Sequence, residues 1–230
     1  NKIYKLENGI YKYKLQIDGY FETVDLNVKI KIDDYDIYVD YSNTSNQTNR
    51  ASINCVYNVT HSSTMYPFKC ALVPNIPNNT GLFNPIKVFA PKGSILNTTF
   101  PHPVQARAKT TNNINQVIFG ALCDVFGEFA QAGSGSIWPF SVYGTDESQN
   151  TFSCHILPHG GRGAMKNMDG LLPIAFPHNS VVTPIEIMEL KAPVLFEKKE
   201  LIPNSGGAGK YRGGLSQMII IKNISKNVIK

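Results

Sequence analysis

A glycine-rich stretch between two apolar runs places the strongest constraint on how this chain can fold. Residues 204–215 read Asn-Ser-Gly-Gly-Ala-Gly-Lys-Tyr-Arg-Gly-Gly-Leu, so five glycines surround one lysine and one arginine. Glycine accepts positive φ angles and lets other groups approach the backbone closely, and successive free N–H groups can bind an anion. Two interpretations are open. One is a tight connection in which only glycine fits, which is the commoner use of such residues; the other is an anion site that draws its charge from Lys210 and Arg212.

The stretch does not match the known nucleotide-binding loops. A phosphate loop requires Gly-Lys-Ser/Thr, but Gly209 and Lys210 are followed by Tyr211. A dinucleotide fingerprint counted from Gly207 and Gly209 would need a glycine where Arg212 stands.

Composition limits the class of protein. The 230 residues are 42% hydrophobic and 17% charged, which predicts one globular domain over residues 1–230, with a lobe boundary near the Gly-Ser-Gly-Ser stretch at 133–136. The net charge of +5 is spread along the chain, so nucleic acid is not the expected partner. No apolar run approaches the roughly 20 residues of a membrane span, and no signal segment opens the chain. We therefore expect a cytoplasmic protein without a membrane partner.

Hydrophobic periodicity predicts an α+β fold. Residues 10–42 alternate apolar and polar side chains and turn at Asp18-Gly19, which indicates a meander of three antiparallel strands. Apolar residues at three- and four-residue steps predict helices over 50–73 and 112–132, the second capped by Thr110 or Thr111. The expected fold is a mostly antiparallel, twisted β structure with one or two long packed helices.

The remaining chemistry-bearing residues indicate no metal or catalytic centre. The four cysteines form no Cys-x-x-Cys pair, so buried free thiols are expected. His155 and His159 are four residues apart, but Pro158 disfavours the helix that would make this a zinc pair. Glu186 and Glu189 lie in a predicted strand, which would place them on opposite faces, so ion pairing is their expected role. We assign no metal ligand and no catalytic residue.

The glycine-rich stretch also carries a family resemblance. Together with Glu200-Leu201, residues 204–215 resemble the Glu-Leu-x-x-Asp-Ser-Gly-Gly-x-Gly-x-x-Arg-Gly-Gly-Leu signature of the hydantoinase B/5-oxoprolinase family, which includes the large subunits of acetone and acetophenone carboxylases. Asn204 stands where the family usually has aspartate. Further blocks that resemble the family lie at residues 40–47, 159–170 and 179–193, so the resemblance runs from about residue 6 to residue 221.

The resemblance implies a role within a larger enzyme. Family members are about twice this length, and the chain resembles their C-terminal portion, so it is expected to be a fragment that lacks the N-terminal half of a B-type subunit. The expected activity is ATP-dependent hydrolytic opening of a cyclic amide, 5-oxoproline or a hydantoin, with a hydantoinase A-type, ATP-binding partner subunit. ATP and a divalent metal are implied for the complete enzyme and no cofactor for this segment. Two alternatives remain open: a non-catalytic remnant or assembly module, and a segment of an ATP-dependent ketone carboxylase.

The same resemblance, with the charges of the two glycine clusters, yields the candidate site. The residues expected to bind an anionic substrate group are Gly160, Gly161, Arg162, Gly163, Gly206, Gly207, Gly209, Lys210 and Arg212.

Overall fold

The computed structural model describes residues 2–178 and 180–227, so Asn179 lies outside the described residues. The chain divides into two compact units, residues 1–132 and residues 133–230. The mixed architecture of antiparallel sheets and a few helices confirms the predicted α+β class. Every helix in the described residues is too short or too polar to cross a lipid bilayer.

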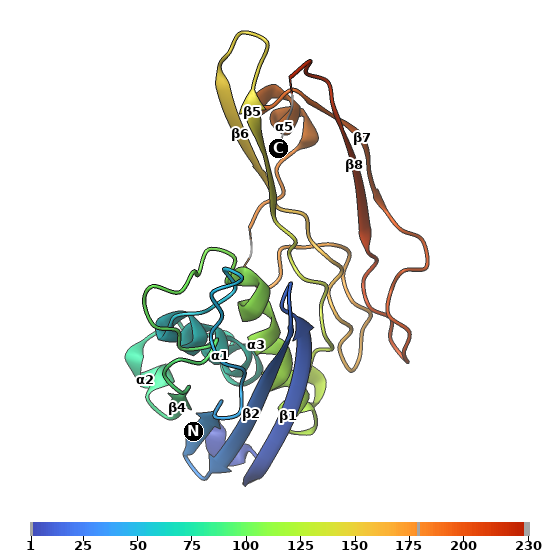
Figure 1. Cartoon of the computed structure of the whole chain (residues 1–230). Helices are drawn as coiled ribbons and strands as arrows, with labels where there is room; N and C mark the ends of the chain where they lie inside the picture. Colours follow the sequence, from blue (N-terminus) through green and yellow to red (C-terminus); the bar gives the residue numbers. More distant parts are fainter. Residues whose placement is uncertain (1, 179, 228–230) are drawn as a thin grey trace. The chain divides into compact units, whose positions relative to one another are not determined.

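A four-stranded sheet forms the framework of the first unit (Figure 1). Its order is β1 (Gly9–Asp18), β2 (Thr23–Asp33), β3 (Asp36–Asp40) and β4 (Ile86–Phe89). The first three strands are the predicted antiparallel meander, and β4 adds a parallel pairing to β3. Every second residue of β2 from Val24 to Ile32 is buried, so one face of the sheet is covered and the other is open.

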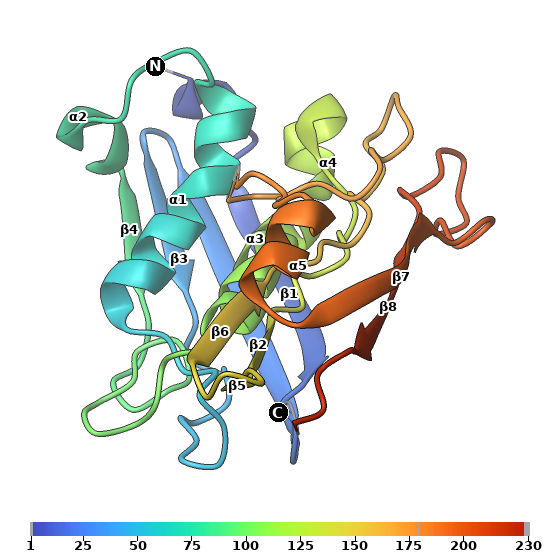
Figure 2. The same cartoon turned by 90° about the horizontal axis from the view of Figure 1, so that it is seen from above.

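Two helices cover the buried face of this sheet (Figure 2). They are α1 (Tyr57–Leu72) and α3 (Ala108–Ala121), and they also pack on each other. Tyr41 is fully buried between sheet and helix, and its hydroxyl shares a hydrogen bond of 2.7 Å with Thr64 of α1. Shorter elements complete the unit: η1 (Ile3–Lys5), α2 (Thr80–Phe83), α4 (Cys123–Phe126) and η2 (Gly127–Phe129).

The helix predicted over 50–73 begins seven residues later than expected. Residues 50–56 form a loop because buried Asn54 bonds to backbone groups through its side chain: it accepts from Thr48 N–H at 2.8 Å and donates to the carbonyls of Thr48 and Pro103. Such side-chain bonds compete with the helical ladder. Pro67 lies inside α1, within the range predicted as helix.

The helix predicted over 112–132 is broken into three pieces. α3 begins four residues earlier than expected and ends at Ala121, and α4 and η2 follow it. The predicted caps, Thr110 and Thr111, lie within the helix, and neither caps it. The Thr110 hydroxyl instead donates to the Ile53 carbonyl at 2.7 Å, which ties α3 to the loop before α1.

The second unit is built from two β ribbons and a short helix. The hairpin of β5 (Phe140–Thr145) and β6 (Thr151–Ile156) and the ribbon of β7 (Val194–Leu201) and β8 (Gln217–Asn223) both flank α5 (Ile185–Lys191) (Figure 1). Their shared core consists of Cys154, Ile156, Met188, Ala192, Val194 and Phe196. Asn227, after the end of β8, donates to the carbonyls of Thr145 and Asp146 at the tip of the hairpin.

Candidate functional site

The two glycine clusters lie against each other within the second unit. Arg162 N–H donates to the Leu171 carbonyl at 3.0 Å, and the Arg162 carbonyl accepts from Gly214 N–H at 2.9 Å. Gly170 N–H donates to the Arg212 carbonyl at 2.7 Å. The segments therefore hold one another through their backbones.

Glycine is required where these backbones touch. A Cβ atom built on any member of this contact region would fall within 3.0 Å of a backbone atom of a facing segment, closer than real Cβ atoms come. We call this set the glycine array; its members are Gly135, Gly160, Gly161, Gly170 and Gly214. At these positions the glycines serve close backbone approach, which favours the structural interpretation for this part of the motif.

The glycines of residues 204–215 do not adopt positive φ angles. None of the five has a φ in the left-handed region, whereas Asn204 does, with a φ of 58°. Asparagine tolerates this conformation better than most residues, so the chain turns at Asn204 and the glycines follow in ordinary conformations.

The more exposed part of the motif is the loop of residues 206–212, called here the open loop; at its start Gly206 is half-buried, and a Cβ there would lie within 3.0 Å of the Gly213 carbonyl oxygen. The N–H groups of Gly206, Gly207 and Gly209 make no backbone hydrogen bond to a described residue. Gly207 to Lys210 are exposed, and a 3.0 Å bond from Gly213 N–H to the Gly207 carbonyl closes the loop. The N–H groups of Arg162 and Gly163 are hydrogen-bonded within the protein. The N–H groups of Gly206, Gly207 and Gly209 instead remain available as hydrogen-bond donors.

The three predicted cations differ in their surroundings. Arg162 donates to the Met165 sulfur at 3.0 Å and lies over the ring of Phe176. Lys210 lies 5.7 Å from the ring centre of Tyr211, and neither Lys210 nor Arg212 forms an ion pair with a described residue. The charges of Lys210 and Arg212 are therefore available beside the open loop.

Sequence reasoning missed the polar groups that hold the open loop in place. Asp169 accepts the Arg212 N–H at 2.7 Å, and Ser205 accepts the Ser216 N–H at 2.7 Å. Ser134, in the stretch interpreted as a linker, accepts the Gly163 N–H at 2.9 Å. The Asp-Gly pair at 169–170 was the one sequence signal that could have identified such a contact, since short polar residues beside glycine commonly bond to nearby backbone.

The carboxylates and histidines do not assemble into a further centre. Glu189 lies on α5, not on a strand as predicted, and its carboxylate accepts the Phe196 N–H at 2.7 Å, beside an irregularity in β7. His155 is exposed and bonded to Ser141, while His159 is buried. Within the described residues, no three His, Cys, Asp or Glu side chains gather as metal ligands would.

His159 is an unusual buried histidine. Only 2% of the residue is exposed, and neither ring nitrogen has a hydrogen-bond partner among the described residues. Burial lowers the pKa of His159, and the nearby charges of His178 and Lys199 lower it further. The folded chain therefore holds this imidazole neutral.

Stability should consequently fall on the acid side of neutrality. The unfolded chain takes up a proton near pH 6.5 while folded His159 resists it, so the free energy of unfolding is unaffected above about pH 7 and decreases as the pH falls below 6.5. Urea unfolding at pH 7.5 and 5.5 measures this. His159→Leu should reduce the acid loss, while His155→Gln, at an exposed histidine, should retain it; equal acid loss in all three proteins would contradict the assignment.

The open loop is not a phosphate loop of the nucleotide-binding type. A phosphate loop leads into a helix whose N-terminus faces the phosphates, but residues 206–212 lead into strand β8. Lys210 is also followed by Tyr211 instead of the hydroxyl residue that such loops place on the metal ion.

Comparison with known proteins identifies the family to which the chain with this glycine array and open loop belongs. A sequence profile described as hydantoinase B/oxoprolinase matches residues 1–228. The chain belongs to this family. The candidate B-type subunit of a D-/L-hydantoinase from Pseudomonas sp. (strain NS671) is 30% identical over 94% of the chain, and the 5-oxoprolinase PfmaA of Pestalotiopsis fici is 30% identical over 86%. The family resemblance seen in the motifs is thus confirmed.

Solved structures share the fold of the hydantoinase B-family chain. An ATP-dependent caprolactamase from Pseudomonas jessenii superposes with a TM-score of 0.82 over 96% of the chain at 23% identity, and a nucleotide-free acetone carboxylase with 0.82 over 95% at 18%. The chain spans only part of these proteins: 39% of the Pseudomonas sp. hydantoinase polypeptide, 16% of the fungal 5-oxoprolinase and 40% of the caprolactamase chain.

Proposed function

We propose that this chain is the C-terminal portion of a hydantoinase B-type subunit that takes part in ATP-dependent hydrolytic opening of a cyclic amide, 5-oxoproline or a hydantoin. The family match over nearly the whole chain supports the assignment. The observation that carries the site is the open loop, whose unbonded N–H groups lie beside two cations without ion-pair partners in the described chain.

The open loop is suited to bind an anionic group. Backbone N–H groups that point to solvent and two nearby cations together favour a carboxylate or a phosphate, and arginine can meet either with two parallel hydrogen bonds. The group would be the carboxylate of 5-oxoproline or a phosphate that the partner has transferred. The glycine array would hold the loop rigidly, because its segments are bonded backbone to backbone.

The rest of the reaction needs other polypeptides. A cyclic amide resists attack by water, and this chain has neither a nucleotide loop nor a cluster of three metal-ligating side chains in its described residues. We propose that a hydantoinase A-type subunit supplies the ATP-dependent activation and that the N-terminal half of the B-type subunit completes the site. The sizes of the relatives are consistent with this division.

Reconstitution tests the proposal. The purified chain with Mg-ATP and 5-oxoproline or a hydantoin should show no turnover, whereas addition of a hydantoinase A-type subunit and a B-type N-terminal half should produce it. Turnover by the chain alone would refute the division of labour. No turnover of any cyclic amide by the reconstituted complex would refute the proposed activity and leave the two alternatives, a non-catalytic assembly module and a segment of an ATP-dependent ketone carboxylase.

The anion site has its own test in the same complex. Because removal of a charged donor from a developing or bound anion typically costs 10²- to 10³-fold in rate, Lys210→Ala combined with Arg212→Ala should lower kcat/KM by about 100-fold or more. Lys222→Ala, at an exposed lysine of β8, is the control and should retain activity. If the double variant matches this control, the open loop does not bind the substrate, although the family role could still hold.

A further inference from the structure

Strand β1 is a free edge of the sheet in the first unit. It pairs with β2 along all ten of its residues, and the strand order places it at the outside of the sheet (Figure 1). In an antiparallel ladder about half of the backbone N–H and C=O groups of an edge strand point away from its neighbour. On that side, β1 makes no backbone hydrogen bond to any described residue. A ten-residue edge of this kind is a template for another strand.

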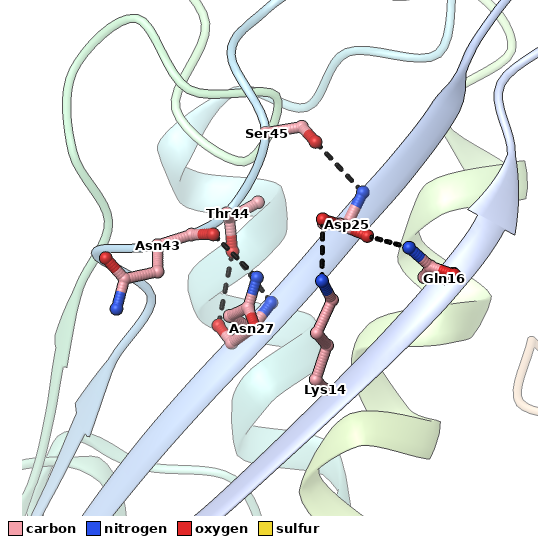
Figure 3. A network of polar contacts seen from close by, with 7 residues as sticks. All are labelled: Lys14, Gln16, Asp25, Asn27, Asn43, Thr44 and Ser45. Atoms are coloured by element: carbon pink, nitrogen blue, oxygen red, sulfur yellow. Dashed lines mark hydrogen bonds and ion pairs between the residues drawn. The ribbon is translucent and has the colours of Figure 1, made fainter.

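The open face of β1 and β2 carries a pair of lysines without counter-charges. Lys12 and Lys29 lie directly opposite each other in the ladder, an arrangement in which like charges destabilise a sheet. Lys14, by contrast, pairs with Asp25 at 2.9 Å, as Figure 3 shows. The other lysines of this face are also paired, Lys31 with Asp33 and Lys87 with Asp36, whereas Lys12 and Lys29 form no ion pair within the described residues.

A groove of about 480 Å³ lies over these lysines. Its lining residues include Lys12, Lys14 and Lys29, the polar residues Asn27, Ser42 and Asn43, and also Tyr13 and Val28. Its one carboxylate, Asp40, is already bonded to the N–H and hydroxyl of Ser42. The network around Asp25 fixes the loop that forms one wall: Ser45 accepts the Asp25 N–H at 2.9 Å, and Asn27 donates to the Asn43 carbonyl (Figure 3).

Charge decides what can occupy this edge. A second copy of the chain, paired antiparallel about a two-fold axis at Tyr13, would continue the open face and set Lys12 of one copy beside Lys14 of the other, which is unfavourable. A single small anion would gain little, because exposed ion pairs are weak and the groove has no buried donor. A strand with several carboxylates gains a backbone ladder as well as repeated charge contacts.

We propose that β1 receives an extended segment of another polypeptide that carries Asp or Glu at alternate positions, with its carboxylates beside Lys12 and over the groove at Lys29. The segment would extend the sheet by one strand. Lys12 and Lys29 would then have two roles. They discourage self-pairing of a long edge strand, and they select an acidic partner. This inference does not depend on the proposed catalytic role.

Peptide binding tests the proposal with the full chain. The probes are three ten-residue peptides in which glutamate, glutamine or lysine alternates with threonine and valine. At low salt the glutamate peptide should bind at least tenfold more tightly than the glutamine peptide, and the lysine peptide should bind least. Hydrogen exchange should slow at the amides of residues 9–18 and at no other strand, and the preference for glutamate should weaken as salt is raised.

Charge reversal provides the decisive variant. The double substitution Lys12→Glu with Lys29→Glu should invert the preference, so that the lysine peptide binds best, and its unchanged circular dichroism would show that the fold persists. Lys92→Glu, at an exposed lysine in a loop, is the matched control and should keep the original order. The proposal is overturned if the double variant behaves like Lys92→Glu, if a single-stranded oligonucleotide binds β1 as well as the glutamate peptide does, or if the chain pairs with itself through β1.

Discussion

Gly214→Ala is expected to unfold the second unit, while Gly207→Ala, seven residues earlier in the same motif, is expected to leave it folded. A Cβ on residue 214 would overlap the Leu171 carbonyl and reach within 3.0 Å of Arg162 N. A Cβ on residue 207 would meet nothing within 4 Å. Both glycines have φ values that alanine can adopt, so the difference comes from space alone.

The size of the effect of Gly214→Ala depends on which atoms would have to move to make room for the new Cβ atom. The atoms in the way at residue 214 are backbone atoms, held by the Arg162–Leu171 and Gly214–Arg162 hydrogen bonds. Relief of the overlap would break both bonds, so overpacking and lost hydrogen bonds together should cost about 4 kcal/mol, at the upper end for a point mutation. Gly207→Ala should instead be neutral or stabilise by about 0.5 kcal/mol, since alanine restricts the unfolded chain.

The single tryptophan allows the unfolding of the second unit to be measured. Trp138 belongs to the second unit and stacks on Phe140, so its fluorescence during urea unfolding reports on that unit. A Gly214→Ala protein with the urea midpoint of Gly207→Ala would show that the backbone contact in the glycine array is loose. In that case the structural interpretation of Gly214 would be wrong.

The sequence could indicate which glycines matter but not why each one does. The motif at residues 204–215 predicted either a tight turn or an anion site. Gly214 is fixed by close packing, while Gly207 and Gly209 lie in the open loop, for which the anion site is our proposal. This difference depends on residues 160–171, which are about 50 positions away. Local sequence contains no information on which backbone segment will face a given glycine. The sequence pattern alone therefore left both the tight turn and the anion site open.

The strands were predicted better than the helices for a related reason. Alternation along residues 10–42 is a local signal that is read directly as a half-buried sheet, and the meander has the predicted strands. The burial of His159 and the bond from Glu189 to the Phe196 N–H depend on tertiary packing, and no local period indicates them. The start of α1 was misplaced because one side chain, Asn54, overrides an apolar stripe that otherwise favours a helix.

Asn54→Ala is accordingly expected to destabilise the first unit strongly. The residue is fully buried and joins two loops: its amide donates to the carbonyls of Thr48 and Pro103 at 2.7 and 2.8 Å and accepts from Thr48 N–H. Its removal would leave these groups without partners. At roughly 1–3 kcal/mol for a buried group left unsatisfied, the total loss should be about 3 kcal/mol.

Two further variants separate the hydrogen bonds from the volume of the side chain. Asn54→Leu fills the same space without polar atoms, and it should be destabilised nearly as much as Asn54→Ala because the same backbone groups lose their partners. Asn58→Ala, at an exposed asparagine in the first turn of α1, should be neutral or slightly stabilising, since alanine favours the helix. Helical circular dichroism during urea unfolding reports mainly on this unit, because α1 and α3 are the long helices of the described chain. Recovery of stability in Asn54→Leu would show that packing, and not the bonds of the amide, holds residues 48–54 away from the helix.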